Sequence, residues 1–467
     1  MTAIERQAKR REKILQGKIL NTILMVAIPL VFYNLCNYMY GIFDMMIVQT
    51  SGIGEAGDIV VLDQIKNMLS TIGSSLAAGG GIITARLYGE GNISKAKKSA
   101  NTLFTSALII SLVTLIFIPL GKPLLILFNT DRTTIDNAMG YYYVQILVLL
   151  VTTMNSAFIA IEKAKGNTRL LFGLNIMVVV LKIAITIFFI YGPFKNVTMT
   201  WIALATLIAQ MSMFVVGMIL CFKKSNVLGI KIKELNLAKS IIKNILVLSF
   251  PIFIGRFLFS FGKVYVNSVA LEAYGKDCVG ALGISNTIVG LLSNIINSFE
   301  DGSSTIVSQN YGNCNGRRIQ KVFSTNLVVL TIISLFGTVL LIVLQSPIAK
   351  FFAPGNPTQQ EMIINIVKYE RLDIIFMGLQ GAANALFYGF GKTRITMVIS
   401  MSQLFALRIP ALLLMINVFK INYEACGIAM LFSNSVSGAV AIIIALIFII
   451  TMPKNTKYCN IFPEVSA

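Results

Sequence analysis

One carboxylate inside a long apolar segment is the first residue whose type and setting point to chemistry. Asp44 lies near the end of the run Ile19–Val48, which contains Pro29 and no basic residue within one turn of the acid. As a helix, this run would be about 45 Å long, enough to cross a bilayer. A lone carboxylate at membrane depth is expensive, so Asp44 should face the protein interior or a watery cavity. There it could hold a proton or a small cation.

Other kinds of chemistry are excluded or unsupported. The chain has no histidine, which excludes a Ser-His-Asp triad, an HExxH metalloprotease and a histidine zinc site. The segment GFGKTR resembles the end of a phosphate-binding loop, but the earlier glycine would have to stand at position 386, which is leucine. We therefore expect no enzyme activity, no metal site and no cofactor.

The elements that must position Asp44 are membrane-spanning helices. Apolar residues make up 56% of the 467-residue chain and charged residues only 13%, about half the share usual in soluble domains. The sequence predicts an all-α membrane protein with about twelve spans. The apolar runs cover residues 19–48, 59–85, 100–121, 138–160, 169–192, 199–222, 244–271, 279–308, 322–345, 362–388, 395–418 and 425–450.

The basic residues of the loops predict an orientation. Loops on one side of the predicted membrane carry 26 lysines and arginines, and loops on the other side carry six. Because basic loops stay in the cytoplasm, this asymmetry places both termini there. It also explains the net charge of +19 without a nucleic-acid partner.

The two halves of the chain are repeats. ILMVAIP, ending at Pro29, parallels ILVLSFP, ending at Pro251, and GNTR parallels GKTR, at offsets of 222 to 225 residues. Each half has an even number of spans, so this is a parallel repeat whose pseudo-twofold axis follows the membrane normal. The predicted divisions are a basic tail (1–18), an N-lobe (19–222), a linker (223–243), a C-lobe (244–450) and a second tail (451–467).

Several of these segments together resemble the multidrug and toxic compound extrusion (MATE) family, part of a superfamily that includes flippases for lipid-linked sugars. They are Pro29 with Tyr40 and Asp44 after it, GGGIITARLYGEGNISKA, the GNTR and GKTR pair, SQNYG, and LRIP at 407–410. The resemblance covers nearly the whole chain. It implies two six-helix lobes forming a V around a central cavity, and export of organic cations in exchange for protons or sodium ions.

The resemblance also implies an ion-coupling site, which this sequence changes. In the subfamily resembling DinF, the Asp of span 1 is joined by Asn and Asp from span 5 and by Thr from span 6. This chain keeps Asp44 and Thr206 but has Lys182 and Thr186 in place of the Asn and the second Asp. We hypothesise an Asp44–Lys182 ion pair, which would disfavour sodium at this site. A buried salt bridge without a transport role is the alternative.

A second coupling pattern, resembling NorM, has a Glu in span 7 and an Asp in span 10. Only Asp373 could correspond here, so the choice between proton and sodium stays open. Glu300 could be a cavity acid that attracts cations or a carboxylate at a helix end. The residues predicted to line the substrate cavity are Tyr40, Asn37, Arg256, Lys263, Glu300 and Asp373.

These features favour a secondary active multidrug exporter working by alternating access. We expect a monomer in the bacterial cytoplasmic membrane, with the lipid bilayer and lipophilic cations as its partners. The alternative is a flippase or exporter of lipid-linked or anionic substrates, which the intramembrane cations Lys182, Arg256 and Lys263 favour.

Overall fold

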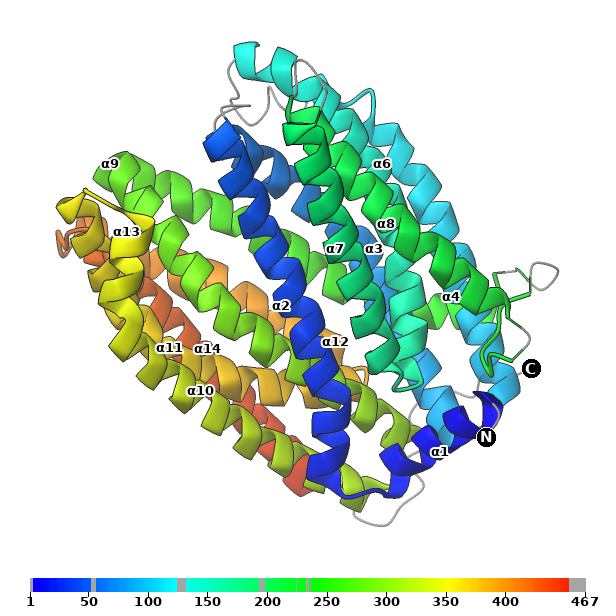
Figure 1. Cartoon of the computed structure of the whole chain (residues 1–467). Coiled ribbons are helices and arrows are strands. Elements are labelled where there is room, and N and C mark those ends of the chain that lie inside the picture. The colour runs from blue at the N-terminus through cyan, green and yellow to red at the C-terminus, as the bar shows by residue number, and fades with distance from the viewer. Residues whose placement is uncertain are drawn as a thin grey trace. The chain divides into compact units, whose positions relative to one another are not determined.

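The structure is a computed structural model of the chain. It describes residues 3–51, 56–123, 132–192, 198–223, 225–231, 235 and 237–452. In these residues the regular structure is entirely helical, as Figure 1 shows. The predicted all-α fold is therefore confirmed.

In the described part of the first half, a short helix precedes six long ones. Pro29 lies inside the first long helix, and Asn92 caps the start of another by accepting a hydrogen bond from the backbone N–H of Lys95 at 3.0 Å. The helices are α1 (Ala3–Gln16), α2 (Ile19–Ser51), α3 (Ala56–Glu90), α4 (Ile93–Val113) with the 3₁₀ turn η1 (Thr114–Phe117), α6 (Arg132–Ala164), α7 (Thr168–Tyr191) and α8 (Met199–Phe222).

The second half repeats this order with two local changes. Gly275 has φ +83°, a left-handed conformation that glycine adopts without strain, and it divides α9 into two helices. The π-helix η3 interrupts the helix that corresponds to α7. The elements are α9 (Lys239–Gly312), α10 (Gly316–Phe352), α11 (Pro357–Gly389), α12 (Thr393–Met401), η3 (Ser402–Arg408), α13 (Ile409–Asn417) and α14 (Glu424–Thr451).

The span prediction agrees with these helices. Among the described residues, ten helices are long and apolar enough to cross a membrane. One of the ten is α9, which Gly275 divides into two spans. α11 is not one of them, because its apolar sequence is interrupted by charged and amide side chains. With α9 counted as two spans and α11 included, the described helices match the twelve predicted spans.

The repeat is visible in the backbone. Gly166 and Gly391 both have φ +70° where α6 and α11 end. Asn315 caps α10 through the backbone N–H of Arg318 at 3.1 Å, as Asn92 caps α4 in the first half. The same positive-φ glycine and the same asparagine cap therefore recur at the predicted repeat offset.

The chain forms two compact units, which exchange one segment each. Unit 1 contains the described residues of 1–16 and 32–253, and unit 2 contains residues 17–31 and the described residues of 254–458. The first part of α2 thus packs with unit 2, and the first part of α9 packs with unit 1. The predicted lobes begin at 19 and 244, before these two segments, and stay predictions.

The exchange follows the repeat. The unit boundaries at 31/32 and 253/254 lie 222 residues apart, each two residues after the proline of its helix, Pro29 or Pro251. In unit 2, a Cβ on Gly302 would lie 3.3 Å from the backbone of Ala27; in unit 1, one on Gly79 would lie 2.9 Å from the backbone nitrogen of Ser249. Glycines at equivalent positions therefore let each exchanged segment pack closely.

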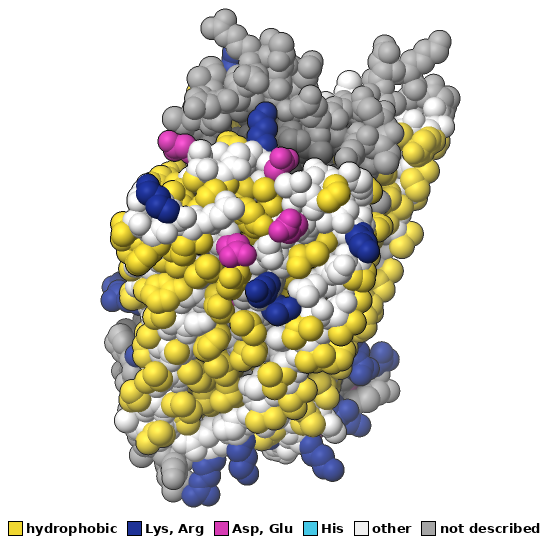
Figure 2. All heavy atoms as spheres, turned by 90° about the vertical axis from the view of Figure 1, so that its left-hand side faces the viewer, with side chains coloured by type: hydrophobic (Ala, Val, Ile, Leu, Met, Phe, Trp, Pro, Cys, Tyr) yellow, Lys and Arg dark blue, Asp and Glu magenta, His cyan; other side chains and the backbone are white. Residues whose placement is uncertain are grey.

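The surface suits a bilayer. α10 exposes large apolar side chains, among them Ile332, Phe336 and Val343, each more than 60% exposed. Figure 2 shows one face covered mostly by hydrophobic side chains, with lysines and arginines gathered along its lower edge. A patch of this extent marks a surface that contacts lipid or another apolar partner.

Candidate functional site

The predicted ion pair is present in unit 1. The Lys182 ammonium on α7 donates a hydrogen bond to Asp44 Oδ2 on α2. The Lys182 side chain is fully buried, whereas that of Asp44 is 18% exposed. Tyr40, one turn before Asp44, places its ring 3.4 Å from the Lys182 nitrogen, measured to the ring centre. The ammonium is therefore held by a carboxylate and by an aromatic face.

The other predicted members of the ion site lie on neighbouring helices. Thr186, one turn after Lys182, is fully buried, and its hydroxyl has no hydrogen-bond partner among the described residues. Thr206 on α8 donates to the carbonyl of Ile202 in its own helix at 3.0 Å. Asn175 ties α7 to α2 by donating to the Tyr33 carbonyl at 2.9 Å. The ion pair is confirmed, and its role in coupling stays a prediction.

Unit 2 contains a second charged site, centred on two acids of α11. Glu370 and Asp373 lie one turn apart and are each 2% exposed. Ser285 on α9 donates to Glu370 Oε2, and Asn434 Nδ2 on α14 donates to Asp373 Oδ2 at 2.5 Å. Asp373, which we predicted to line the substrate cavity, is buried and its carboxylate is bonded to α14; its place in a substrate cavity stays a prediction.

Arg408 completes this site through neutral side chains. Its Nε donates to Ser433 Oγ at 2.9 Å and its Nη2 donates to Asn434 Oδ1 at 2.6 Å. Gln403 Nε2 donates to the same Asn434 oxygen. Residues five apart on an α-helix point about 140° apart, but a π-helix brings positions i and i+5 together. The π-helix η3 thus lets Gln403 and Arg408 reach one amide.

Lys182 and Arg408 occupy equivalent positions in the two repeats. Leu181-Lys182-Ile183 corresponds to Leu407-Arg408-Ile409 at an offset of 226, one more than the offset between Thr168 and Thr393 at the helix starts. The extra residue falls where η3 forms, since a π turn spans one residue more than an α turn. The similarity of LKIA to LRIP was the signal in the sequence that would have revealed this equivalence.

Of the remaining predicted cavity residues, Lys263 lies beside the charged site of unit 2, because the Phe259 ring contacts both Lys263 and Arg408. In unit 2, Asn384 Nδ2 donates to Glu300 Oε2 at 3.3 Å, and Arg256 acts on Glu300 electrostatically. Lys263 is exposed, with its ammonium 5.2 Å from the centre of the Phe259 ring. Asn37 lies in unit 1, where it hydrogen-bonds the Tyr33 side chain on its own helix.

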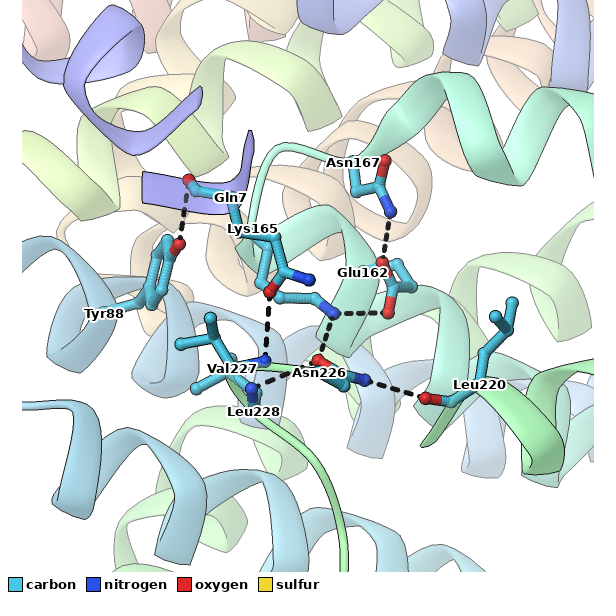
Figure 3. Close-up of polar contacts among 9 residues, drawn as sticks. All are labelled: Gln7, Tyr88, Glu162, Lys165, Asn167, Leu220, Asn226, Val227 and Leu228. Carbon is cyan, nitrogen blue, oxygen red and sulfur yellow. Dashed lines mark hydrogen bonds and ion pairs between the residues drawn. The ribbon is translucent and has the colours of Figure 1, made fainter. Parts of the chain in front are cut away.

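A polar cluster at the basic end of unit 1 was not predicted. Figure 3 shows Lys165 between Glu162 and Asn226, at 2.5 Å from Glu162 Oε1 and 2.9 Å from Asn226 Oδ1. Glu162 and Lys165 are each 2% exposed, although Lys165 is one of the 26 basic residues that we counted in the predicted cytoplasmic loops. The hydrogen bond from Lys165 to Asn226 fixes the end of α6 against the segment that follows α8.

Helix α1 packs against this cluster. Gln7 accepts from the Val227 N–H at 3.1 Å, and its carbonyl accepts from the Tyr88 hydroxyl at 3.3 Å. Burial lowers the pKa of the Arg10 guanidinium, and the negative charge of Glu162 opposes this shift. These contacts hold α1 on unit 1 and have no feature that points to transport.

The sequence also matches known proteins. The MatE family model matches residues 29–188 and 251–414, two stretches that begin 222 residues apart at Pro29 and Pro251. The probable multidrug resistance protein NorM of Thermotoga maritima is 21% identical over 440 residues, which are 88% of each chain.

Solved structures share the fold. A multidrug resistance MATE family transporter of the MOP superfamily, in an outward-facing conformation, has a TM-score of 0.86 at 17% identity and covers 94% of this chain and 97% of its own. A MOP superfamily transporter from Pyrococcus furiosus Vc1, described as having a binding pocket of reversed polarity, has a TM-score of 0.88 at 16% identity with the same coverage. Because the family model covers more than half of the sequence, the chain belongs to the MatE family of membrane transporters.

Proposed function

We propose that this protein exports lipophilic organic cations in exchange for protons. Membership of the MatE family makes it a multi-pass membrane transporter. The export of several drugs is supported by a NorM relative and by a structural neighbour, both described as multidrug resistance proteins. Alternating access through two repeated units would expose one binding site to each side in turn.

The observation that carries this proposal is the contact of Lys182 with Asp44. Sodium prefers several oxygen ligands, and here a buried ammonium already neutralises the carboxylate. Two unit charges about 4 Å apart repel by about 4 kcal/mol at an effective dielectric constant of 20. A sodium ion beside Lys182 would meet this repulsion, so the site disfavours sodium as the coupling ion and leaves the proton as the candidate.

The same contact supports a cationic substrate. The Asp44 carboxylate and the Tyr40 ring already bind an ammonium group, that of Lys182. An organic cation carries the same charge, and aromatic faces bind such cations well. In this proposal the substrate competes with Lys182 for Asp44, and proton binding favours the state that releases the substrate.

The placement in the cell follows from the basic loops. We propose that the protein lies in a bacterial cytoplasmic membrane as a monomer, with both termini in the cytoplasm. Residues 3–16 of the basic tail fold as α1 and pack on unit 1. A reporter fused to the C-terminus and read from each side of the membrane tests the orientation.

The function is tested by ethidium efflux from cells and ethidium uptake into inside-out vesicles, under separate proton and sodium gradients. We expect only the proton gradient to drive the parent, and we expect Asp44→Asn to abolish efflux. Glu361→Gln, which removes an exposed acid near the start of α11, is the charge-matched control and should keep parental efflux. Efflux driven by sodium alone, or no ethidium export at all, would refute the proposal.

A second candidate function is export of anionic or lipid-linked substrates. It is favoured by two exposed bases of unit 2, Arg256 and Lys263, and by likeness to a transporter described as having reversed pocket polarity. In vesicles without ethidium export, substrate-stimulated proton flux with an anionic lipid headgroup analogue would favour this candidate. Loss of that flux in Lys263→Gln would assign it to unit 2.

A further inference from the structure

We propose that Cys278 and Cys426 form a disulfide at the outer side of the membrane, which joins α9 to α14 within unit 2. The proposal rests on the orientation proposed above, because it needs this end of unit 2 to lie outside the cytoplasm. It concerns two buried thiols that take no part in the proposed transport. Both cysteines are free in the structure, so the proposed bond is a covalent modification of this chain.

The two thiols are neighbours in space although they lie far apart in the sequence. The Cys426 thiol donates a hydrogen bond to the Cys278 sulfur. Cys278 is 0% exposed and Cys426 is 1% exposed, so each sulfur is enclosed by protein. A disulfide needs an S–S distance of about 2.05 Å and Cβ atoms about 3.8 Å apart. Because the two thiols already share a hydrogen bond, side-chain rotation and a small approach of the helices complete the bond.

A second contact ties the same two segments together. Tyr274 on α9 donates from its hydroxyl to the carbonyl of Ile421 at 2.7 Å, and Ile421 lies in the turn before α14. The Tyr274 hydroxyl also lies within electrostatic range of both thiols. The tyrosine and the thiol pair therefore belong to one contact between α9 and the start of α14, and the disulfide would fix a contact that packing already makes.

The position of Cys278 suits it to be the attacking sulfur. It follows Gly275, where the second helix of α9 begins, by three residues and so lies in the first turn of that helix. The positive end of a helix dipole favours a thiolate, which is the attacking species in disulfide exchange. The hydrogen bond from Cys426 supports the same thiolate. Asp277, directly before Cys278, is exposed, so the pair lies next to solvent.

The charge pattern places this end of unit 2 on the outer side. The residues just before the two cysteines include Lys276 and Lys420, which are two of the six basic residues on the predicted outer side. Disulfides form and persist outside the cytoplasm, whereas cytoplasmic thiols are kept reduced. Cys221 gives the contrast: it is just as buried, but it lies at the basic end of unit 1 and should stay a thiol.

The reaction is a thiol–disulfide exchange with a disulfide oxidant of the outer compartment, such as the disulfide of a thiol oxidoreductase. The Cys278 thiolate attacks one oxidant sulfur, which breaks the oxidant S–S bond and releases one oxidant thiolate. Cys426 loses its proton, attacks the Cys278 sulfur and displaces the second oxidant thiolate. The two cysteines give up two electrons and two protons, and the oxidant becomes a dithiol. Because both thiols are buried in the folded unit, the exchange precedes the packing of α9 on α14.

The test is differential labelling of the full chain in cells that produce it. Acid precipitation stops exchange, iodoacetamide in denaturant blocks free thiols, and N-ethylmaleimide after reduction marks the sulfurs that were in disulfides. Mass spectrometry of peptides then reads each cysteine. We expect N-ethylmaleimide on Cys278 and Cys426 and iodoacetamide on Cys221, which is the internal control. An unreduced digest should contain the peptides of Cys278 and Cys426 linked to each other.

Two single variants sharpen the test. Cys278→Ala should leave Cys426 as a free thiol that takes iodoacetamide, and Cys426→Ala should do the same for Cys278. Iodoacetamide on both cysteines of the parent would overturn the proposal, whichever side of the membrane they face. N-ethylmaleimide that persists on the remaining cysteine of either variant would also overturn it, because that sulfur would have another partner. The labels require no transport, so this proposal and the proposed function fail separately.

The stapling of α9 to α14 has its own readout. Dithiothreitol should lower the melting temperature of the purified parent by about 3 °C or more, because a disulfide that closes a long loop stabilises the folded state. It should lower the melting temperature of Cys278→Ala by less. Equal shifts in the two proteins would contradict a disulfide that holds the two helices together.

Discussion

The two repeats carry equivalent basic residues in opposite settings. Lys182 in unit 1 contacts the Asp44 carboxylate directly. Arg408 in unit 2 contacts neutral oxygens of Ser433 and Asn434, and the Asn434 amide separates it from Asp373. One fold thus holds one acid neutralised by a cation and another acid bonded only to an amide. The difference predicts that the two acids differ in how readily they bind a proton.

The other members of the two sites also differ between repeats. At the repeat offsets, Asp44 corresponds to Val266 and Asp373 corresponds to Val148. Glu370 corresponds to Gln145, a buried neutral residue of the same shape. Each unit therefore places its acids where the other unit has neutral side chains, and the basic residue is what both share.

The largest expected effect comes from removing Lys182. Lys182→Met leaves Asp44 without its partner, and breaking a buried pair destabilises proteins by about 3–5 kcal/mol. The partial exposure of Asp44 should bring the loss to the lower end of that range. Thermal unfolding of the detergent-solubilised protein measures it. The double variant Asp44→Asn/Lys182→Met should recover most of the loss, and strictly additive losses would contradict direct pairing.

A smaller effect should follow from Arg408→Lys. The guanidinium donates from two nitrogens to Ser433 and Asn434 in a fixed geometry, which one ammonium does not reproduce. We expect a loss of about 1–3 kcal/mol in the free energy of unfolding, from buried acceptors left unpaired. The reciprocal change, Lys182→Arg, retains the charge but introduces a side chain that is too large for this fully buried site. Equal stability of Arg408→Lys and the parent would show that the fork geometry has no importance.

The smallest effect concerns the aromatic partner of Lys182. Tyr40→Phe keeps the ring face and should change the unfolding free energy by less than about 0.5 kcal/mol. Tyr40→Leu removes that face and should lose about 1–2 kcal/mol. The comparison is informative only in the presence of the ammonium. In the Lys182→Met background, the difference in unfolding free energy between Tyr40→Phe and Tyr40→Leu should therefore shrink. A difference of unchanged size would argue against a cation–π contact.

The sequence predicted the elements well, because span length, loop charge and repeated motifs are local signals. It also predicted the Asp44–Lys182 pair, since a lysine replaced a polar residue at a position next to the acid in related proteins. It did not predict the unit 2 site. The bonds of Asp373 to Asn434, and of Arg408 to the same amide, depend on which faces of α11, η3 and α14 meet. No spacing within one helix encodes that packing.

Two further features escaped prediction for physical reasons. Lys165 looks like a loop cation, but Glu162, three residues earlier, and Asn226 bury it. The exchange of the first parts of α2 and α9 between units follows from helix packing at Gly79 and Gly302, where the absence of a side chain matters more than any motif. Both depend on contacts between segments far apart in sequence.

The central claim is that Lys182 takes the place of a metal cation beside Asp44. The most direct test is the melting temperature of the purified parent and of Lys182→Asn, each with sodium or with choline at the same ionic strength. An ion that binds the folded state raises the melting temperature. We predict that sodium leaves the parent unchanged and stabilises Lys182→Asn. Stabilisation of the parent by sodium, absent in Asp44→Asn, would contradict the account.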